Sequence, residues 1–249
     1  MTRLIFVSLL ALVSCTAAPS AIATAQPRAT VSPTLFVTTS GPTASPTSAA
    51  ATFRYVAIGA SDTVGVGASD PRTGSWPARV AARLPAGTDY LNLGVSGSVA
   101  SQAAREQVPA AISARPQLVT IWLAVNDLNA NLSGSDYAAA LRSVVAPLVS
   151  GTTARMFVGD VPDLRSVPAY AGTDQTALLA RIAAYNAAIT ALAATFPGRV
   201  TVVDLFTGSG PLVSTITVSA DGFHPSDAGY VLIADRFATA IAGAGIVLR

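Results

Sequence analysis

The single histidine of the 249-residue chain, His224, offers the clearest chemistry in the sequence. Asp221 precedes it by three residues, and Pro225 follows it directly. A carboxylate at this spacing can turn back and accept a hydrogen bond from imidazole Nδ1, which leaves Nε2 to take a proton from a hydroxyl group. A histidine at the surface or near a helix cap is the alternative interpretation. We favour the catalytic interpretation because the only imidazole in the chain lies in this context.

Ser61 is the candidate nucleophile, since it follows Gly59 and Ala60 at the end of an apolar run. A glycine close to a serine at a strand end lets the backbone turn sharply and leaves the hydroxyl exposed above a sheet. The same pattern also fits a phosphate-binding loop or an ordinary turn. A Walker-type phosphate loop is excluded because the chain contains no lysine.

Gly94 and Asn126 are candidate donors to a substrate oxyanion, because each follows a separate apolar run. A glycine lets its N–H approach a ligand closely, and an asparagine amide is a neutral donor. Together with the Ser61 N–H they would form an oxyanion hole for the negative charge that develops during acyl transfer. A plain turn at Gly94 and a helix cap at Asn126 are the alternatives.

These residues need a scaffold that brings distant segments together, and the remaining pattern predicts one. Short apolar runs alternate with amphipathic stretches, which is typical of a parallel sheet covered by helices. The predicted strands cover residues 55–58, 90–93, 118–123, 155–158 and 200–204. The predicted helices cover residues 76–84, 100–113, 136–149, 176–196 and 226–242. Ligands of open parallel sheets bind at the carboxyl ends of the strands, where the candidate residues fall.

In chain order, the segments around Ser61, Gly94, Asn126 and the pair Asp221 and His224 resemble the signature blocks of the SGNH (GDSL-like) hydrolase superfamily. The resemblance implies an α/β fold: a three-layer α/β/α, flavodoxin-like doubly wound parallel sheet of about five strands. It also implies an ester hydrolase without a cofactor. In that enzyme Ser61 would be the nucleophile, His224 the base and Asp221 the group that orients the base.

The resemblance covers residues 55–230 and departs from the family pattern at two positions. Ala60 stands where the GDSL pattern has an aspartate before its serine, and Ala124 stands where the third block usually begins with glycine. Neither position supplies a catalytic side chain in the family. We therefore expect changed local packing and retained activity.

Three functions fit the sequence. The leading one is a serine esterase, a carboxylic ester hydrolase acting on lipid, lysophospholipid or acetylated-sugar esters. The others are an acyltransferase with the same acyl-enzyme and a non-catalytic cell-surface binding protein, and the complete set of five site residues argues against the last. One domain leaves no room for a large lid, so we expect an open site for short acyl groups. The loop 162–173, with Leu164, Val167 and Tyr170, is the expected specificity element.

Composition excludes other classes of protein. The chain has one cysteine, one histidine and a net charge of +2, with its arginines scattered along the sequence. Zinc sites need several histidine or cysteine ligands, so no metal site is expected. A nucleic-acid footprint needs clustered basic residues, so no nucleic-acid partner is expected. We expect a monomer whose partner is a small-molecule, carbohydrate or lipid ester.

The N-terminus predicts export. Residues 1–14 have the charged start and short apolar core of a signal peptide, and they end in a lipobox-like segment before Cys15. We predict that Cys15 is lipidated and anchors the protein to a membrane at the cell surface or in the periplasm; a plain signal cut after Ala23 is the alternative. Residues 15–52 are rich in Ala, Thr, Ser and Pro and predict a disordered linker, which leaves 53–249 as the hydrolase domain.

Overall fold

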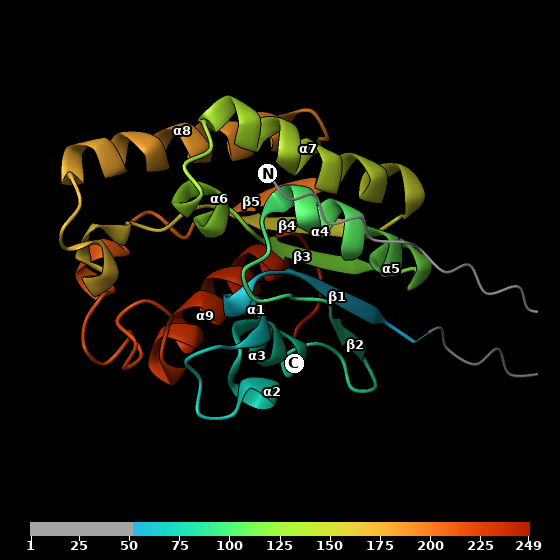
Figure 1. Ribbon diagram of the computed structural model, residues 1–249. Coiled ribbons are helices and arrows are strands. Elements are labelled where there is room, and N and C mark those ends of the chain that lie inside the picture. The colour runs from blue at the N-terminus through green and yellow to red at the C-terminus, as the bar shows by residue number, and fades with distance from the viewer. Residues whose placement is uncertain (1–51) are drawn as a thin grey trace, which may run out of the picture. The chain divides into compact units, whose positions relative to one another are not determined.

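The polar candidate residues follow the strands of a parallel sheet in the computed structural model, which describes residues 52–249 (Figure 1). The described part of the chain lies within one compact unit. The predictions for the signal peptide, Cys15 and the linker up to residue 51 lie outside the described residues.

The five strands pair in the order β2-β1-β3-β4-β5, and every neighbouring pair is parallel. They are β1 (Arg54–Gly59), β2 (Asp89–Asn92), β3 (Leu118–Trp122), β4 (Arg155–Gly159) and β5 (Val200–Val203). β3 is buried along its whole length, which explains why it reads as a continuous apolar run. β2 lies at an edge and is mostly exposed. The predicted flavodoxin-like strand order is confirmed.

Helices cover both faces of the sheet (Figure 1). The elements after the first three strands are α1 (Ser61–Val64), α2 (Pro71–Gly74), α3 (Trp76–Ala81), α4 (Ala100–Glu106), α5 (Val108–Ser113), α6 (Val125–Asn129) and α7 (Gly134–Gly151). The later ones are α8 (Gln175–Ala194), α9 (Asp227–Gly243) and the 3₁₀ turns η1 (Leu164–Ser166), η2 (Pro168–Tyr170) and η3 (Gly210–Leu212). α4, α5, α7 and α8 lie on one face, and α3 and α9 lie on the other, so the predicted three layers are confirmed.

Each face has its own apolar core. On the side of α7 and α8, the rings of Tyr137 and Tyr185 stack with centroids 4.3 Å apart. On the side of α3 and α9, Trp76 stacks on Phe237 at 4.2 Å and meets the Trp122 ring edge-on at 6.2 Å. β3, the strand in the middle of the sheet, therefore packs against a helix layer on each of its faces.

Side-chain caps set the starts of the three long helices. Ser133 accepts from the Asp136 N–H at the start of α7, Asp174 accepts from two N–H groups at the start of α8, and Ser226 caps α9. Within the described part of the chain, α8 alone is long and apolar enough to cross a membrane. Its buried residues pack in the core beside α7, as expected for a core helix of the domain.

The predicted helix 100–113 is two helices, α4 and α5, which meet at Gln107. Pro109 causes the break, because it has no N–H to donate and its ring would clash with the carbonyl of Arg105 one turn earlier. The break directs the Gln107 side chain toward the end of β1, which matters for the site described next.

Candidate active site

The site lies where the chain leaves β1 and β3. Gly59 is paired with Trp122 at the ends of these two strands, so the segments that follow them start side by side. The chain turns directly from β1 into α1, whose first residue is Ser61. A Cβ on Gly59 would lie 1.9 Å from Thr63 Oγ1 and 2.7 Å from the Trp122 carbonyl oxygen. Only glycine fits at this turn.

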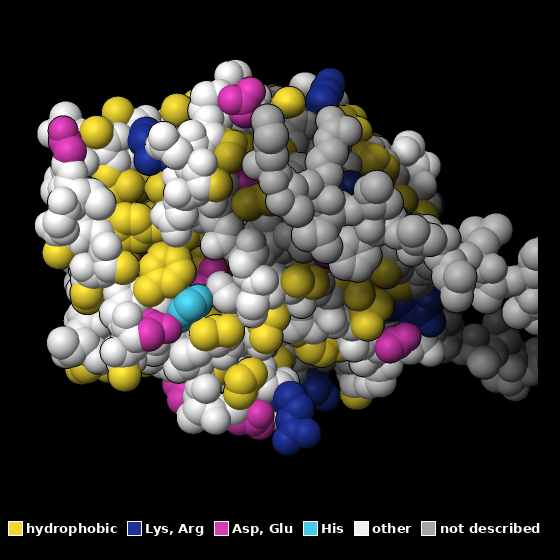
Figure 2. All heavy atoms as spheres, in the orientation of Figure 1, with side chains coloured by type: hydrophobic (Ala, Val, Ile, Leu, Met, Phe, Trp, Pro, Cys, Tyr) yellow, Lys and Arg dark blue, Asp and Glu magenta, His cyan; other side chains and the backbone are white. Residues whose placement is uncertain are grey.

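Ser61, His224 and Asp221 form a continuous chain of hydrogen bonds. Ser61 Oγ lies 2.9 Å from His224 Nε2, and His224 Nδ1 lies 2.6 Å from Asp221 Oδ2. With the proton on Nδ1 held by the carboxylate, Nε2 can accept the serine proton. Ser61 is 7% exposed, and the His224 side chain is 16% exposed. Figure 2 shows this single imidazole at the surface, with apolar side chains around it.

Asp221 is held as a hydrogen-bond acceptor. Its Oδ1 accepts from the N–H of Phe223 at 2.8 Å, from the N–H of His224 at 2.9 Å and from Ser219 Oγ at 2.8 Å. Desolvation raises the pKa of Asp221, but the hydrogen bonds from His224, Phe223 and Ser219 outweigh it and hold this pKa well below its usual range. Asp221 is therefore ionised at neutral pH.

The loop that carries Asp221 and His224 is tied to the rest of the site. The Ser219 N–H donates to the His224 carbonyl at 2.8 Å, and an isolated antiparallel bridge joins Val218 to Pro225. The Tyr230 hydroxyl, on α9, donates to the Val66 carbonyl at 2.6 Å. This last bond links the histidine loop to the segment after the nucleophile, although the two are far apart in sequence.

Two of the three predicted oxyanion donors have a free N–H. The Ser61 N–H has no acceptor among the described residues. Asn126, the second residue of α6, donates from Nδ2 to the Ser98 carbonyl at 3.0 Å. This bond orients the amide and leaves its second N–H for a ligand.

The prediction for Gly94 needs correction. Its N–H donates to Asn92 Oδ1 at 2.9 Å, so it is not available to an oxyanion. Gly97 is the candidate in its place: it lies in a turn at φ 79°, and within residues 52–249 its N–H has no acceptor. It also directly precedes Ser98, which holds Asn126. The signal that could have separated the two glycines is Asn92, since an asparagine often bonds the backbone N–H two residues on.

Buried polar side chains that the sequence did not single out join the loops of the site. Gln107 accepts from the Gly59 N–H at 3.0 Å and donates to the Gly59 carbonyl at 2.9 Å and to Ser98 Oγ at 3.2 Å. Asp127 accepts from the Ala100 N–H at 3.0 Å. Gln107 thus connects the nucleophile turn to the residue that orients Asn126. A lone glutamine inside a helical stretch carries no recognisable signal for this role.

Ala124 has a backbone conformation that is unusual for alanine. It lies directly before α6 at φ 123°, a region that L-residues rarely adopt, and it is 1% exposed. This is the position where the family pattern has glycine. The departure therefore places strain next to Asn126, where we had expected altered packing.

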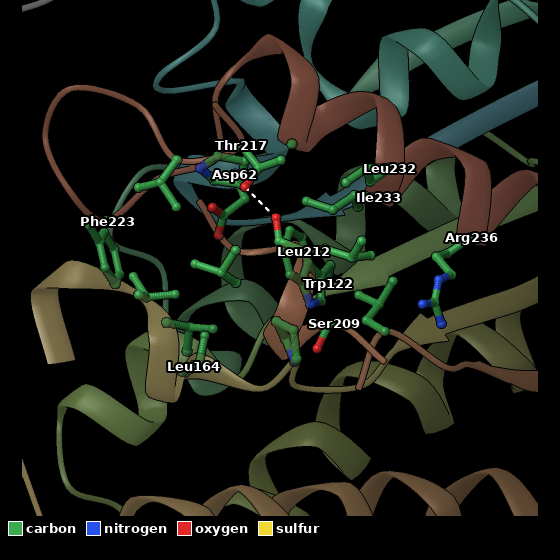
Figure 3. Close-up of a pocket in the computed structure, with 18 residues that line it drawn as sticks. Asp62, Trp122, Leu164, Ser209, Leu212, Thr217, Phe223, Leu232, Ile233 and Arg236 are labelled. Carbon is green, nitrogen blue, oxygen red and sulfur yellow. Dashed lines mark hydrogen bonds between the residues drawn. The ribbon is translucent and has the colours of Figure 1, made fainter. Parts of the chain in front are cut away.

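A pocket of about 130 Å³ opens beside the triad (Figure 3). Asp62, which follows the nucleophile, lines it together with Phe223 and Pro225, the two neighbours of His224. The predicted specificity loop contributes Pro162, Leu164 and Val167 but not Tyr170, and the segment 205–218 contributes much of the rest. That second segment was not foreseen, because its sequence has no periodic pattern.

Asp62 differs from Asp221 in its electrostatics. Burial raises the pKa of Asp62 to about 6, an effect that the nearby His224 opposes. No ion pair of Asp62 occurs within the described part of the chain. In the same part of the chain, no group of three or more His, Cys, Asp or Glu side chains could hold a metal ion.

A comparison with protein families identifies one match. Residues 57–232 match the GDSL-like Lipase/Acylhydrolase family. No curated protein matches the chain significantly. Among solved structures, a mutant of Axe2, an acetyl-xylooligosaccharide esterase from Geobacillus stearmophilus, is similar with a TM-score of 0.61 and 19% identity over 76% of this chain and 94% of that one.

Two further structures have the same fold. The lipase/acylhydrolase from Enterococcus faecalis has a TM-score of 0.58 and 19% identity over 79% of this chain and 97% of that one. The psychrotrophic esterase EstA from a Pseudoalteromonas species, inhibited by monoethylphosphonate, has a TM-score of 0.58 and 16% identity over 76% and 97% of the two chains. At these identities the likeness concerns the fold.

Proposed function

We propose, since the chain belongs to the GDSL-like lipase/acylhydrolase family, that it is an esterase that hydrolyses acyl esters through an acyl-enzyme on Ser61. The observation that carries the proposal is the hydrogen-bond chain from Ser61 Oγ through His224 to Asp221, with distances of 2.9 and 2.6 Å. A serine hydroxyl becomes a useful nucleophile when an adjacent base accepts its proton, and this geometry provides that base.

In the first half of the reaction, Ser61 Oγ attacks the ester carbonyl carbon while its proton passes to His224 Nε2. The carbonyl oxygen becomes an oxyanion and accepts hydrogen bonds from the N–H groups of Ser61 and Gly97 and from Asn126 Nδ2. When the tetrahedral intermediate collapses, the bond to the alcohol breaks and the alcohol takes the proton from His224. The acyl group remains on Ser61.

In the second half, water replaces the alcohol. It gives a proton to His224 and attacks the acyl carbon, and the same donors stabilise the second oxyanion. The intermediate then collapses to the carboxylic acid, and Ser61 recovers its proton from His224. Asp221 remains ionised throughout, because its pKa is held low, and it stabilises the imidazolium in both halves.

Hydrolysis is favoured over acyl transfer by the position of the base. His224 is 16% exposed and lies at the surface, so water reaches the acyl-serine easily (Figure 2). An acyltransferase with the same acyl-enzyme remains the second candidate, and it would need an acceptor alcohol that outcompetes water. Lipid, lysophospholipid and acetylated-sugar esters are the substrate classes that the family offers.

The proposal is tested by the order in which single substitutions reduce hydrolysis of p-nitrophenyl acetate and butyrate. We expect Ser61→Ala to lower kcat on the order of a millionfold, because the nucleophile is lost. Asn126→Ala should lower it roughly a hundred- to a thousandfold, because one donor is lost and the backbone donors remain. Ser69→Ala, at an exposed serine of the next loop, is the matched control and should keep the wild-type rate. A folded Ser61→Ala protein with wild-type rates would rule out the serine mechanism.

A further inference from the structure

We propose that the pocket beside the triad binds a quaternary ammonium group on the alcohol part of an ester substrate, with the Asp62 carboxylate as its counter-ion. The inference rests on the proposed esterase function, because it names a substrate class for that site. The ligand would be an ester of the choline type, whose cationic group is carried by the alcohol that leaves.

The lining of the pocket is mostly apolar. Its only charged residues are Asp62 and Arg236. Figure 3 places Asp62 on the side of Phe223 and Leu164, and Arg236 at the opposite end. The guanidinium of Arg236 donates to the carbonyls of Asp204 at 2.9 Å and Thr207 at 2.8 Å, so its charge is already held by the backbone. Asp62 therefore dominates the electrostatics at the end nearest the triad.

Asp62 lacks a cationic partner in the described structure. No arginine forms an ion pair with it, and no side chain donates a hydrogen bond to its carboxylate. His224 is close, but it must be neutral to accept the serine proton. A partly buried, unpaired carboxylate is costly, and the raised pKa of Asp62 reflects this cost. A bound cation would remove it.

The remaining walls favour an alkylated ammonium over one that carries N–H groups. The pocket hydroxyls of Ser209 and Thr217 already donate to the Phe206 carbonyl at 2.8 Å and to the Leu212 carbonyl at 2.7 Å. Their oxygens also accept from the N–H groups of Asp163 and Ser214. An ammonium with three N–H groups needs several acceptors, and the lining offers it the Asp62 carboxylate and little else. A quaternary ammonium needs none, and the aromatic residues Trp122 and Phe223 in the lining are the type that stabilise such a cation.

Size and position fit the alcohol part of the substrate. A dry protein cavity of about 150 Å³ accepts benzene, and a trimethylammonium group has a similar volume, so a pocket of about 130 Å³ that opens to solvent has room for it. Phe223 and Pro225, which flank His224, form part of the wall. Because His224 returns its proton to the departing alcohol, we assign this pocket, which begins beside the histidine, to the alcohol part of the substrate.

The test compares two thioesters that differ by one charge: butyrylthiocholine and 3,3-dimethylbutyl thiobutyrate, in which a carbon replaces the cationic nitrogen. We expect wild-type kcat/KM to be about tenfold or more higher for the cationic substrate. In Asp62→Asn the ratio should fall toward one, because the cationic substrate loses more than the neutral one. Asp235→Asn, which removes an exposed carboxylate on α9 paired with Arg83, is the charge-matched control and should keep the wild-type ratio.

A second measurement needs no variant. Tetramethylammonium should inhibit wild-type hydrolysis of the neutral thioester competitively, and neutral tert-butanol at the same concentration should not. A wild-type ratio near one, a ratio unchanged in Asp62→Asn, or no difference between the two inhibitors would overturn the inference while Ser61-dependent hydrolysis stands. Loss of hydrolysis of both thioesters only in Ser61→Ala supports the proposed function separately. A wild-type protein that hydrolyses no ester would contradict both the esterase function and the binding of a quaternary ammonium substrate.

Discussion

Two carboxylates flank one imidazole in this site, and their surroundings give them opposite properties. Asp221 accepts hydrogen bonds from His224, Phe223 and Ser219, which overcome desolvation and lower its pKa. Asp62 lies beside the pocket with only its own backbone N–H as a donor, and burial raises its pKa to about 6. The number of hydrogen-bond donors therefore distinguishes the two residues: Asp221 is held to orient the base, and Asp62 is left free for a ligand.

The raised pKa of Asp62 predicts a pH-dependent gain in stability when the charge is removed. The folded state binds the proton more tightly than the unfolded state, so stability is lost as pH rises from about 4 through 6. Asp62→Asn cannot ionise and should avoid this loss. The shift corresponds to at most about 3 kcal/mol, and solvent screening reduces this to roughly 1 kcal/mol at pH 8.

Denaturant unfolding of wild type and Asp62→Asn at pH 4 and pH 8 measures this gain. His224 and Asp221 also face Asp62, and both remain in the variant. Equal stability differences at the two pH values would contradict the assigned cause, because a change in packing alone does not depend on pH.

Single residues also show where sequence reasoning reached its limit. Ser61, Asp221 and His224 could be singled out because their types and spacing are specific for acyl transfer. Choosing between Gly94 and Gly97 required knowing which N–H is already bonded, and the Asn92 side chain decides that. Asp62 could not be assigned at all, because its importance comes from a pocket whose walls are contributed by residues 122–236.

At the scale of elements, two short helices position the nucleophile and one oxyanion donor. α1 begins two residues after the end of β1, and α6 begins three residues after the end of β3. They carry Ser61 and Asn126 in their first two positions. Gly59 permits the turn into α1, while Ala124 makes the equivalent turn into α6 at φ 123°. The second turn is therefore the strained one.

The strain at Ala124 predicts that Ala124→Gly stabilises the protein. An unfavourable φ costs of order 1–3 kcal/mol, and the added glycine loses roughly 0.5–1 kcal/mol through unfolded-state entropy. We expect a net gain of about 1 kcal/mol in the free energy of unfolding, measured by urea denaturation. Ala111→Gly, at a buried helical position in α5, is the control and should destabilise by a similar amount. A loss of stability in Ala124→Gly would contradict the strain.

The elements themselves were largely predictable. The strands match their predicted ranges to within one or two residues, since buried parallel strands read as short apolar runs. The helices α7, α8 and α9 also match closely because their caps and periodic faces are visible in sequence. The break at Gln107 and the short helices α1 and α6 were missed, because four to six residues are too few to show a helical period.

At the scale of the whole molecule, strand order places the site. β1 lies between β2 and β3, so the strand order reverses at β1: β2 is its neighbour in one direction, and β3, β4 and β5 follow in the other. The loops that follow β1, β2 and β3 therefore lie next to one another at the carboxyl ends of the strands. The histidine loop joins them from the start of α9, tied to Val66 through Tyr230. The same loop lines the pocket with Phe223 and Pro225, so one segment carries the catalytic base and part of the substrate-binding surface.

Export and lipid attachment through Cys15 stay predictions from the sequence, as does the linker that ends near residue 52. They complement the proposed function, because a lipid-anchored esterase would meet ester substrates outside the cytoplasm. They do not enter the geometry of the site, which depends on residues 54–230.

The central claim is that Ser61 is the nucleophile and that His224 activates it. It is tested most directly by reaction with a p-nitrophenyl phosphonate, followed by peptide mass spectrometry. We expect a single adduct on Ser61 in the wild type, and strongly slowed labelling in a folded His224→Ala variant, because the hydroxyl then lacks its base. Labelling of another residue, or labelling of Ser61 at the wild-type rate without His224, would contradict the account.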